Sequence, residues 1–132
     1  MAGTFYFQVV SPAGAVLAAD VQFAALPGAE GELGILPRHI PLIATLKSGV
    51  IRYTVDDKVK KIAISGGFVE VGRNQATVLA ETAELAESID MLRAEAARAR
   101  AEKRLQDRAA HVDVARAEAS LRRAVSRLRA KD

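Results

Sequence analysis

The spacing of apolar residues changes at Ser88, and this change limits the possible folds more than any other feature of the sequence. Before Ser88, apolar residues alternate in short runs separated by Gly, Pro and paired Asp residues. Residues 89–130 contain no Gly and no Pro, and Ala, Arg, Glu and Leu recur there at helical spacing. A period of two indicates strands and a period of 3.6 indicates amphipathic helices. We therefore predict a β domain in residues 1–87 and a helical arm in residues 88–132.

The β domain is predicted from seven short runs with turn residues between them. No helical segment separates the runs, so there is no room for helical crossovers between parallel strands. Regularly spaced turns of this kind indicate an antiparallel sandwich or barrel, and the whole chain is then of the α+β class. The runs are residues 5–10, 16–26 with an interruption at Asp20, 40–46, 50–55, 58–65, 68–71 and 76–80.

Two glycine-containing stretches stand out in this part of the chain. Residues 28–37 hold three glycines, which permit tight reversals, and we interpret them as a surface loop. A phosphate-binding loop is not indicated there, because no helix start and no following Lys-Ser or Lys-Thr is present. The stretch Ser65–Phe68 contains Gly66-Gly67, which predicts a β-bulge or a close approach between backbones.

The composition argues against catalysis and metal binding. The chain has no Cys, and its two histidines, His39 and His111, have no neighbouring ligand or nucleophile in the sequence pattern. We therefore predict no catalytic residue and no metal site. The N-terminus lacks the features of a signal peptide, and no apolar run is long enough to span a membrane. We expect a soluble protein.

The arm is predicted to be an antiparallel hairpin of two helices. Ser88 is a suitable N-cap, so the first helix should begin at Ile89 and end near Gln106. The polar stretch 107–111 should interrupt it, and the second helix should cover residues 112–128. Because Ala buries little apolar area, the contact between the helices should be weak enough to open. The predicted contact residues are Ala94, Ala97, Ala101 and Leu105 on the first helix and Val114, Ala117, Leu121, Ala124 and Leu128 on the second.

Positive charge is concentrated in the arm. Residues 88–132 carry a net charge of +5 and residues 1–87 a net charge of −2. Arginines recur at the same spacing on the two helices, so the two rows should converge in an antiparallel pair, where an anion or carboxylates would relieve their repulsion. A solvated helix face and a nucleic-acid-binding arm are the alternatives, but no nucleic-acid-binding motif accompanies the charge. The rows are Arg93, Arg100 and Arg104, then Arg116, Arg123 and Arg127.

Four segments together resemble the epsilon subunit of bacterial F-type ATP synthases: residues 31–37, 39–42, 65–71 and 77–81. With the helical arm, the resemblance covers essentially the whole chain in the same order. It implies a β-sandwich that binds the gamma subunit and lies on the ring of c subunits. It also implies a hairpin that folds down or extends along gamma toward the alpha and beta catalytic subunits. Such a subunit is not catalytic, couples proton flow to ATP synthesis, restrains ATP hydrolysis and lies peripherally at the cytoplasmic face of the cell membrane.

The segment Ile89–Ala94 is similar to the (Ile/Leu)-Asp-x-x-Arg-Ala motif of bacillus-type members, which bind ATP without hydrolysing it. The resemblance thus implies ATP as a regulatory ligand, with no other cofactor required. Mg²⁺ is not needed, because arginines neutralise the phosphates. The implied ATP-binding residues are Glu84, Ile89, Asp90, Arg93, Ala94, Arg100, Arg123 and Arg127.

The resemblance also places the loop from Gly28 to His39 against the polar loops of the c ring. The residues expected to face the ring are Glu30, Glu32, Arg38 and His39. Arg38 stands where the family usually has Gly.

Two other readings compete with a rotor subunit. One is an autonomous nucleotide sensor, and the other is a basic arm for nucleic acid. Co-purification with ATP synthase subunits would favour the rotor subunit, and purification as a free monomer would favour the sensor. An arginine-dependent mobility shift of RNA or DNA would favour the nucleic-acid-binding arm.

Overall fold

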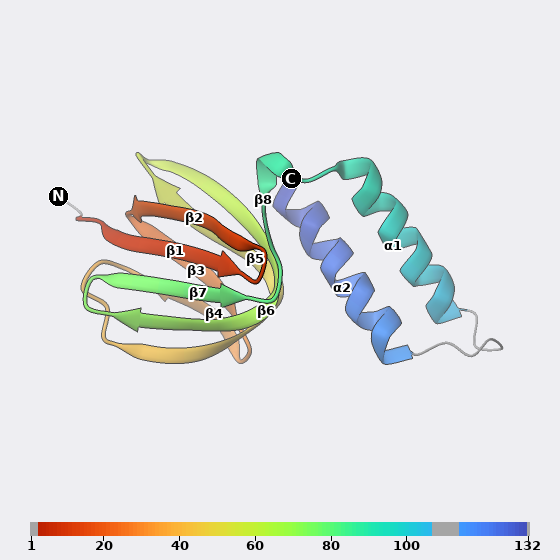
Figure 1. The fold of residues 1–132 in the computed structure, drawn as a ribbon, viewed down its shortest axis with the longest axis horizontal. Helices are drawn as coiled ribbons and strands as arrows, with labels where there is room; N and C mark the ends of the chain where they lie inside the picture. Colours follow the sequence, from red (N-terminus) through yellow and green to blue (C-terminus); the bar gives the residue numbers. More distant parts are fainter. Residues whose placement is uncertain (1–2, 107–113, 132) are drawn as a thin grey trace.

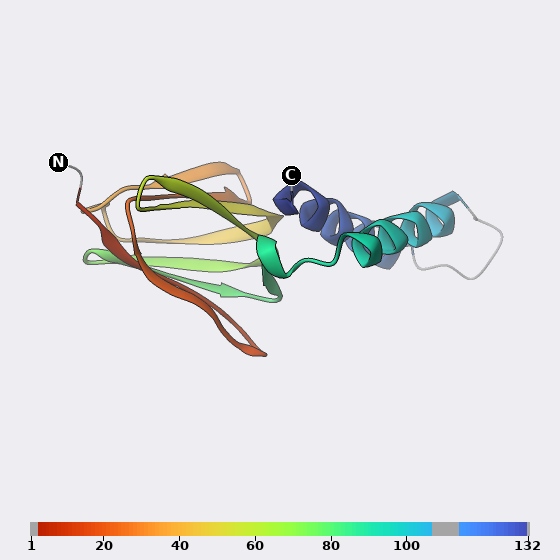
Figure 2. The same cartoon turned by 90° about the horizontal axis from the view of Figure 1, so that it is seen from above.

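The computed structural model describes residues 3–106 and 114–131. A β-sandwich forms one end of the molecule and two helices form the other, as Figures 1 and 2 show. The predicted α+β architecture, a sandwich followed by two helices, is confirmed. The elements are β1 (Phe5–Ser11), β2 (Gly14–Val21), β3 (Phe23–Gly28), β4 (Gly31–Ile35), β5 (Leu42–Val55), β6 (Lys58–Gly72), β7 (Gln75–Ala80), β8 (Ala83–Leu85), the 3-10 helix η1 (Ala86–Ser88), α1 (Met91–Gln106) and α2 (Val114–Lys131).

The strands are hydrogen-bonded in the order β2-β1-β7-β6-β5-β3-β4, and β8 pairs with β6. The long strands β5 and β6 are therefore central and connect the two layers of the sandwich. Asp56 and Asp57 join them, with φ angles of 50° and 64°. Left-handed φ at both residues is typical of the tight turn that matches the twist of a two-stranded hairpin.

One pairing departs from the predicted antiparallel pattern. β1 and β7 run parallel, with Phe7 opposite Ala76. A parallel sheet was not expected from the sequence, because helical crossovers have no room between the runs. Here the connection consists of five intervening strands, β2 to β6, so no helix is needed.

The predicted strand boundaries were wrong in the middle of the sandwich. The expected surface loop, residues 28–37, contains β4, whose pairing with β3 places Gly31 opposite Gly28. The strand break expected at Asp20 lies at Gln22. The expected interruption at Lys47–Gly49 does not break β5, because Ser48 and Gly49 still pair with β6. Only its pairing with β3 is interrupted.

Gly67 is required by a close approach between β6 and β7. A Cβ atom at this position would collide with the carbonyl oxygen of Leu79, and the φ angle of Gly67 is 141°. Only glycine adopts such a conformation without strain, so the predicted close approach at Ser65–Phe68 is confirmed.

The core of the sandwich consists of large apolar side chains that alternate with outward-facing residues along each strand. Phe7, Val9, Leu26, Ile51 and Ile62 are completely buried. This core lies between strands of the sandwich and includes no residue of either helix.

The helical arm begins two residues later than predicted. Ser88 lies in η1, and Ile89 is extended, with φ and ψ of −79° and 126°. Asp90 caps α1 instead, because its Oδ1 accepts a hydrogen bond of 3.2 Å from the Arg93 amide. The extended Ile89 buries its side chain in a cluster with Ala63 and Ala130.

The two helices pack through small side chains, as predicted. Ala94, Ala101, Ala117 and Ala124 are buried, and Leu128 is 9% exposed. α2 continues to Lys131, three residues beyond the predicted end. The predicted break at 107–111, the helix start at 112 and His111 lie outside the described residues.

Candidate functional site

A cavity of about 460 Å³ lies between the helical arm and the sandwich. Its walls come from β6, β8, α1 and α2, so both predicted regions of the chain contribute to it. We call it the arginine cavity, because Arg100 and Arg104 of α1 and Arg123 and Arg127 of α2 line it. The convergence that the arginine spacing predicted is confirmed for these four residues.

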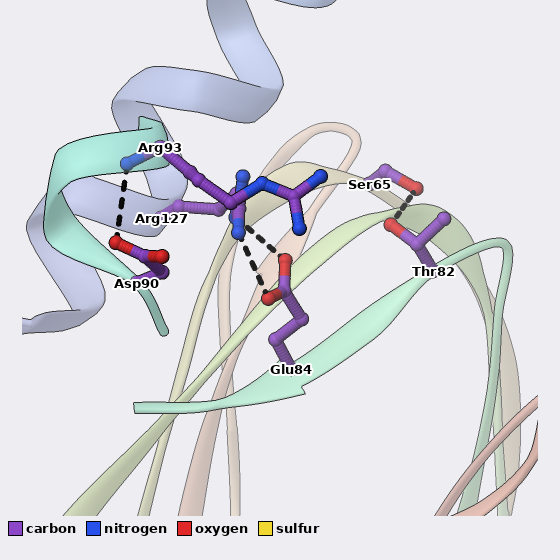
Figure 3. A network of polar contacts seen from close by, with 6 residues as sticks. All are labelled: Ser65, Thr82, Glu84, Asp90, Arg93 and Arg127. Atoms are coloured by element: carbon purple, nitrogen blue, oxygen red, sulfur yellow. Dashed lines mark hydrogen bonds and ion pairs between the residues drawn. The ribbon is translucent and has the colours of Figure 1, made fainter. Parts of the chain in front are cut away.

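Glu84 of β8 is the acidic residue among those that line the arginine cavity. Figure 3 shows its carboxylate facing the guanidinium group of Arg127. Arg127 Nη2 donates a hydrogen bond of 3.1 Å to Glu84 Oε2, and Nε lies 2.6 Å from Oε1. The Nε group is buried and is not aligned for a hydrogen bond. The pair therefore combines one good hydrogen bond with a close ion contact, and it connects the arm to the sandwich.

Positive charge exceeds negative charge in the arginine cavity. Within residues 3–106 and 114–131, Arg100, Arg104 and Arg123 form no ion pair, while Arg123 donates a hydrogen bond of 3.1 Å to Ser120 Oγ. Converging guanidinium groups without carboxylate partners favour an anion that accepts several hydrogen bonds, such as a phosphate chain.

Two hydroxyl groups complete the wall on the sandwich side. Thr82 Oγ1 lies 2.6 Å from Ser65 Oγ, and both residues line the arginine cavity. Figure 3 shows this pair beyond Glu84, with Ser65 on β6 and Thr82 in the turn between β7 and β8. Sequence reasoning missed Ser65 and Thr82 as site residues, because isolated hydroxyl residues carry no spacing signal. It also left Arg104 outside the implied site, although the arginine spacing had identified it.

The other four implied ATP-binding residues lie outside the lining of the arginine cavity, near the start of α1. Asp90 caps the helix and Ala94 is fully buried in the contact between helices. Ile89 is 5% exposed. The Arg93 side chain extends from α1 across the Glu84–Arg127 pair in Figure 3. The structure thus brings together Glu84 and three of the four implied arginines.

The end of α2 packs on the segment that joins the two regions. Ala63, Ile89 and Ala130 form a small buried cluster, and Lys131 Nζ donates a hydrogen bond of 3.1 Å to the Ala86 carbonyl oxygen. Nearby, burial raises the pKa of Tyr53, and the Glu87 carboxylate raises it further. The arm is therefore held at its C-terminal end as well as at the arginine cavity.

The residues expected to face the c ring lie in two separate places. Glu32 forms an ion pair with Arg52 and lines a cavity with Arg129 of α2, at the arm end of the sandwich. Arg38 and His39 line another cavity with Thr4, at the end where the N-terminus lies in Figure 1. Glu30 is exposed at the β3–β4 turn. The stretch is therefore not one loop, because β4 separates its two halves.

In the part of the chain that the structure describes, no group of three His, Asp or Glu residues is arranged to hold a metal ion. None of the described helices is long and apolar enough to cross a membrane.

Comparison with known families gives two matches that together cover nearly the whole chain. The β-sandwich domain of the ATP synthase delta/epsilon chain matches residues 4–86. The long α-helix domain of the same chain matches residues 87–132.

Similar curated proteins are named ATP synthase epsilon chains. The chain is 60% identical over 108 residues to that of Desulfitobacterium hafniense strain Y51, with 82% of each chain covered. It is 52% identical over 103 residues to that of Halalkalibacterium halodurans, with 78% of this chain and 77% of the relative covered. A chain in the cryo-EM structure of the Euglena gracilis mitochondrial ATP synthase, OSCP/F1/c-ring, shares the fold with a TM-score of 0.84. That chain is 21% identical, and the match covers 98% of this chain and 82% of that one.

A sandwich that carries a helical arm, with family matches over both parts, defines the class of this protein. The chain belongs to the delta/epsilon chains of ATP synthases and is an epsilon subunit of the F type.

Proposed function

We propose that this chain is a non-catalytic rotor subunit that couples proton flow to ATP synthesis and restrains ATP hydrolysis through its movable arm. Bound ATP holds the arm folded against the sandwich. The observation that carries this proposal is the arginine cavity, because its walls come from both regions and its charge suits a polyphosphate.

The sandwich supplies the contacts with the other rotor subunits. Phe68 and Leu79 are exposed neighbours on β6 and β7, and Ile43 is exposed on β5 beside them. Residues that alternate with them, such as Val69 and Val78, are fully buried. An exposed apolar face of this kind is typical of a protein interface, and we assign it to the gamma subunit. The loop containing Arg38 and His39 is assigned to the c ring.

ATP stabilises the folded arm by relieving repulsion between the arginines of α1 and α2. Each hydrogen bond to a charged group contributes about 1.5–3 kcal/mol, which is large compared with the contact between alanines. Arg93, Arg100, Arg123 and Arg127 act on the phosphates, while Glu84, Ile89 and Asp90 hold the adenine end. Mg²⁺ is not required, because the guanidinium groups neutralise the phosphate charge.

The extended arm restrains hydrolysis through its charge. Its net charge of +5 favours acidic surfaces on the alpha and beta subunits. The subunit remains peripheral to the membrane and acts on its cytoplasmic face through the complex.

Calorimetric titration of the purified full chain with ATP tests whether ATP is the ligand. The wild type should bind without Mg²⁺, and Arg123→Ala should weaken binding by about tenfold or more, since it removes a charged hydrogen bond. Arg122→Ala is the matched control, because Arg122 is the adjacent arginine, is exposed as Arg123 is, and does not line the arginine cavity. Equal affinities of Arg123→Ala and the wild type would remove this arginine from the site.

The reconstituted complex without residues 88–132 should hydrolyse ATP faster than the complete complex.

A further inference from the structure

A second basic cavity lies on the other side of α2. It has a volume of about 410 Å³ and is lined by residues of β3, β4, β5 and β6 together with Arg129 of α2. Arg127 and Arg129 are two positions apart, so they point about 200° apart around the helix axis. The last turns of α2 thus direct one arginine into each cavity.

The second cavity exists because the pairing of β3 with β5 is interrupted. The register runs from Ala25 opposite Arg52 to Gly28 opposite Leu46, so β5 has three more residues than β3 in this interval. Pro27 lies at the interruption and cannot donate a backbone hydrogen bond. A Cβ at Gly49 would lie 2.6 Å from Pro27 Cβ, so the Pro27 ring packs closely on residue 49 because this residue has no side chain.

The interruption leaves backbone groups of β5 without ladder partners. Alternate residues of a central strand direct their N–H and C=O groups to opposite neighbours. In the segment 47–51, the groups directed to β3 therefore lose that pairing, while residues 48–51 remain paired with β6. Ser48 and Gly49 of this segment line the second cavity beside the cationic side chains.

The side chains of the second cavity carry an excess of positive charge. Lys47, Arg52, Lys61 and Arg129 line it, and Glu32 is its acidic residue. Glu32 forms an ion pair with Arg52, whereas Lys47 and Arg129 form no ion pair with any described residue. Lys47 and Arg129 are exposed and come from different regions of the chain, which brings like charges together when the arm is folded.

We propose that the second cavity binds a phosphate group, and that its occupation stabilises the folded arm independently of the arginine cavity. A phosphate carries more than one negative charge and accepts hydrogen bonds from guanidinium, ammonium and backbone N–H groups together. Because Arg129 belongs to the arm and the other ligands to the sandwich, the complete site exists only when the arm is folded. A ligand that binds only this state shifts the equilibrium toward it.

Titration of the ¹⁵N-labelled full chain with inorganic phosphate tests the site, with NaCl adjusted to keep the ionic strength constant. Saturable NMR shifts are expected at the amides of residues 47–52 and 129. The double variant Lys47→Ala, Arg129→Ala should weaken phosphate binding by about tenfold or more. Lys47→Ala, Arg122→Ala is the matched control with the same change of charge, and it should bind more tightly than the first double variant. The proposal is overturned if NaCl alone produces the same shifts, or if both double variants bind phosphate equally.

A parallel titration in the Arg123→Ala background separates this site from the arginine cavity and identifies the source of the phosphate. Phosphate should bind there as it does to the wild type. If ATP also shifts the amide signals of residues 47–52, the site binds phosphate groups in general. If only inorganic phosphate shifts them, the site binds the free ion. Hydrogen exchange at α2 amides should slow on phosphate binding. Unchanged exchange at saturating phosphate would overturn the coupling to the arm.

Discussion

The sandwich and the arm are stabilised by different kinds of contact. Phe5, Phe7 and Ile51 exemplify the sandwich core, where large side chains are almost completely removed from water. The helices instead meet through Ala101, Ala124 and other small residues. Apolar burial contributes roughly 25 cal/mol per Å², so small side chains contribute much less per contact than Phe or Ile. The sandwich thus has a core of its own, whereas the arm depends on additional contacts to remain folded.

Those additional contacts are polar and depend on conditions. The arm is attached through the Glu84–Arg127 pair, through Lys131 on the Ala86 carbonyl, and through the small cluster around Ile89. An ion pair and a ligand can be gained or lost without changing the sandwich. One chain can therefore combine a permanently folded docking domain with an arm whose attachment is reversible.

The largest effect should come from Phe7→Ala in the sandwich. The Phe7 side chain is 0% exposed, and its ring centroid lies 6.2 Å from those of Phe5 and Tyr53. Removing a buried Phe typically costs about 3–5 kcal/mol. Urea unfolding followed by circular dichroism should show this loss. Tyr6→Ala is the control, because Tyr6 is 41% exposed on the same strand, and a similar loss in both variants would contradict a core centred on Phe7.

A smaller effect, confined to the arm, should follow from Ile89→Ala. Ile89 packs on Ala63 and Ala130 at the joint, so its truncation should weaken attachment of the arm by about 2 kcal/mol and leave the sandwich core intact. Faster hydrogen exchange at the end of α2 with an unchanged rate in β6 is the expected result. Leu92→Ala is the matched control, because Leu92 is 84% exposed and should change neither rate. Equal acceleration in β6 would show that the two regions unfold together.

Most of the architecture could be predicted from the sequence, because periods of two and 3.6 are local properties. The start of α1 could not, since Ser88 and Asp90 are both good caps. Burial of Ile89 against Ala130, which is far away in the sequence, decides between them. β4 was missed because its glycines resemble loop residues until β3 pairs with them.

Residues of the candidate site could be predicted from the sequence only where arginines recur at helical spacing along α1 and α2. Arg100, Arg104, Arg123 and Arg127 follow a helical repeat, so their convergence could be anticipated. Ser65 and Thr82 come together only through the turn between strands, and Arg129 meets Lys47 only when the arm folds on the sandwich. These contacts require the tertiary structure, which no local pattern encodes.

The joint between the two regions should respond to alkaline pH through Tyr53. Burial first, and the Glu87 carboxylate second, raise the pKa of Tyr53 above 10.0. The unfolded chain therefore loses this proton at a lower pH than the folded chain does. Stability that is present below pH 10 should fall as the pH rises from 10 through the raised pKa.

The measurement is the free energy of unfolding in urea between pH 9 and about 11.5, where the unfolded side chain ionises. Tyr53→Phe should reduce the loss of stability over this range, and Glu87→Gln should reduce it by a smaller amount. Tyr6→Phe should behave as the wild type does, because the Tyr6 ring is partly exposed. A slope for Tyr53→Phe as steep as that of the wild type would assign the alkaline loss to other groups.

The smallest effect should be a gain in stability from Arg38→Gly, at the end of the sandwich farthest from the arm. Arg38 has a φ of 66°, a left-handed conformation that strains residues with a side chain. Glycine removes this strain but adds freedom to the unfolded chain, so the net gain should be below about 1 kcal/mol. Arg73→Gly is the matched control, because Arg73 lines the same cavity without a left-handed φ and should lose stability instead. Thermal unfolding of the wild type and the two variants measures whether each substitution raises or lowers stability. If Arg38→Gly lost as much stability as Arg73→Gly, contacts of the Arg38 side chain would outweigh its backbone strain.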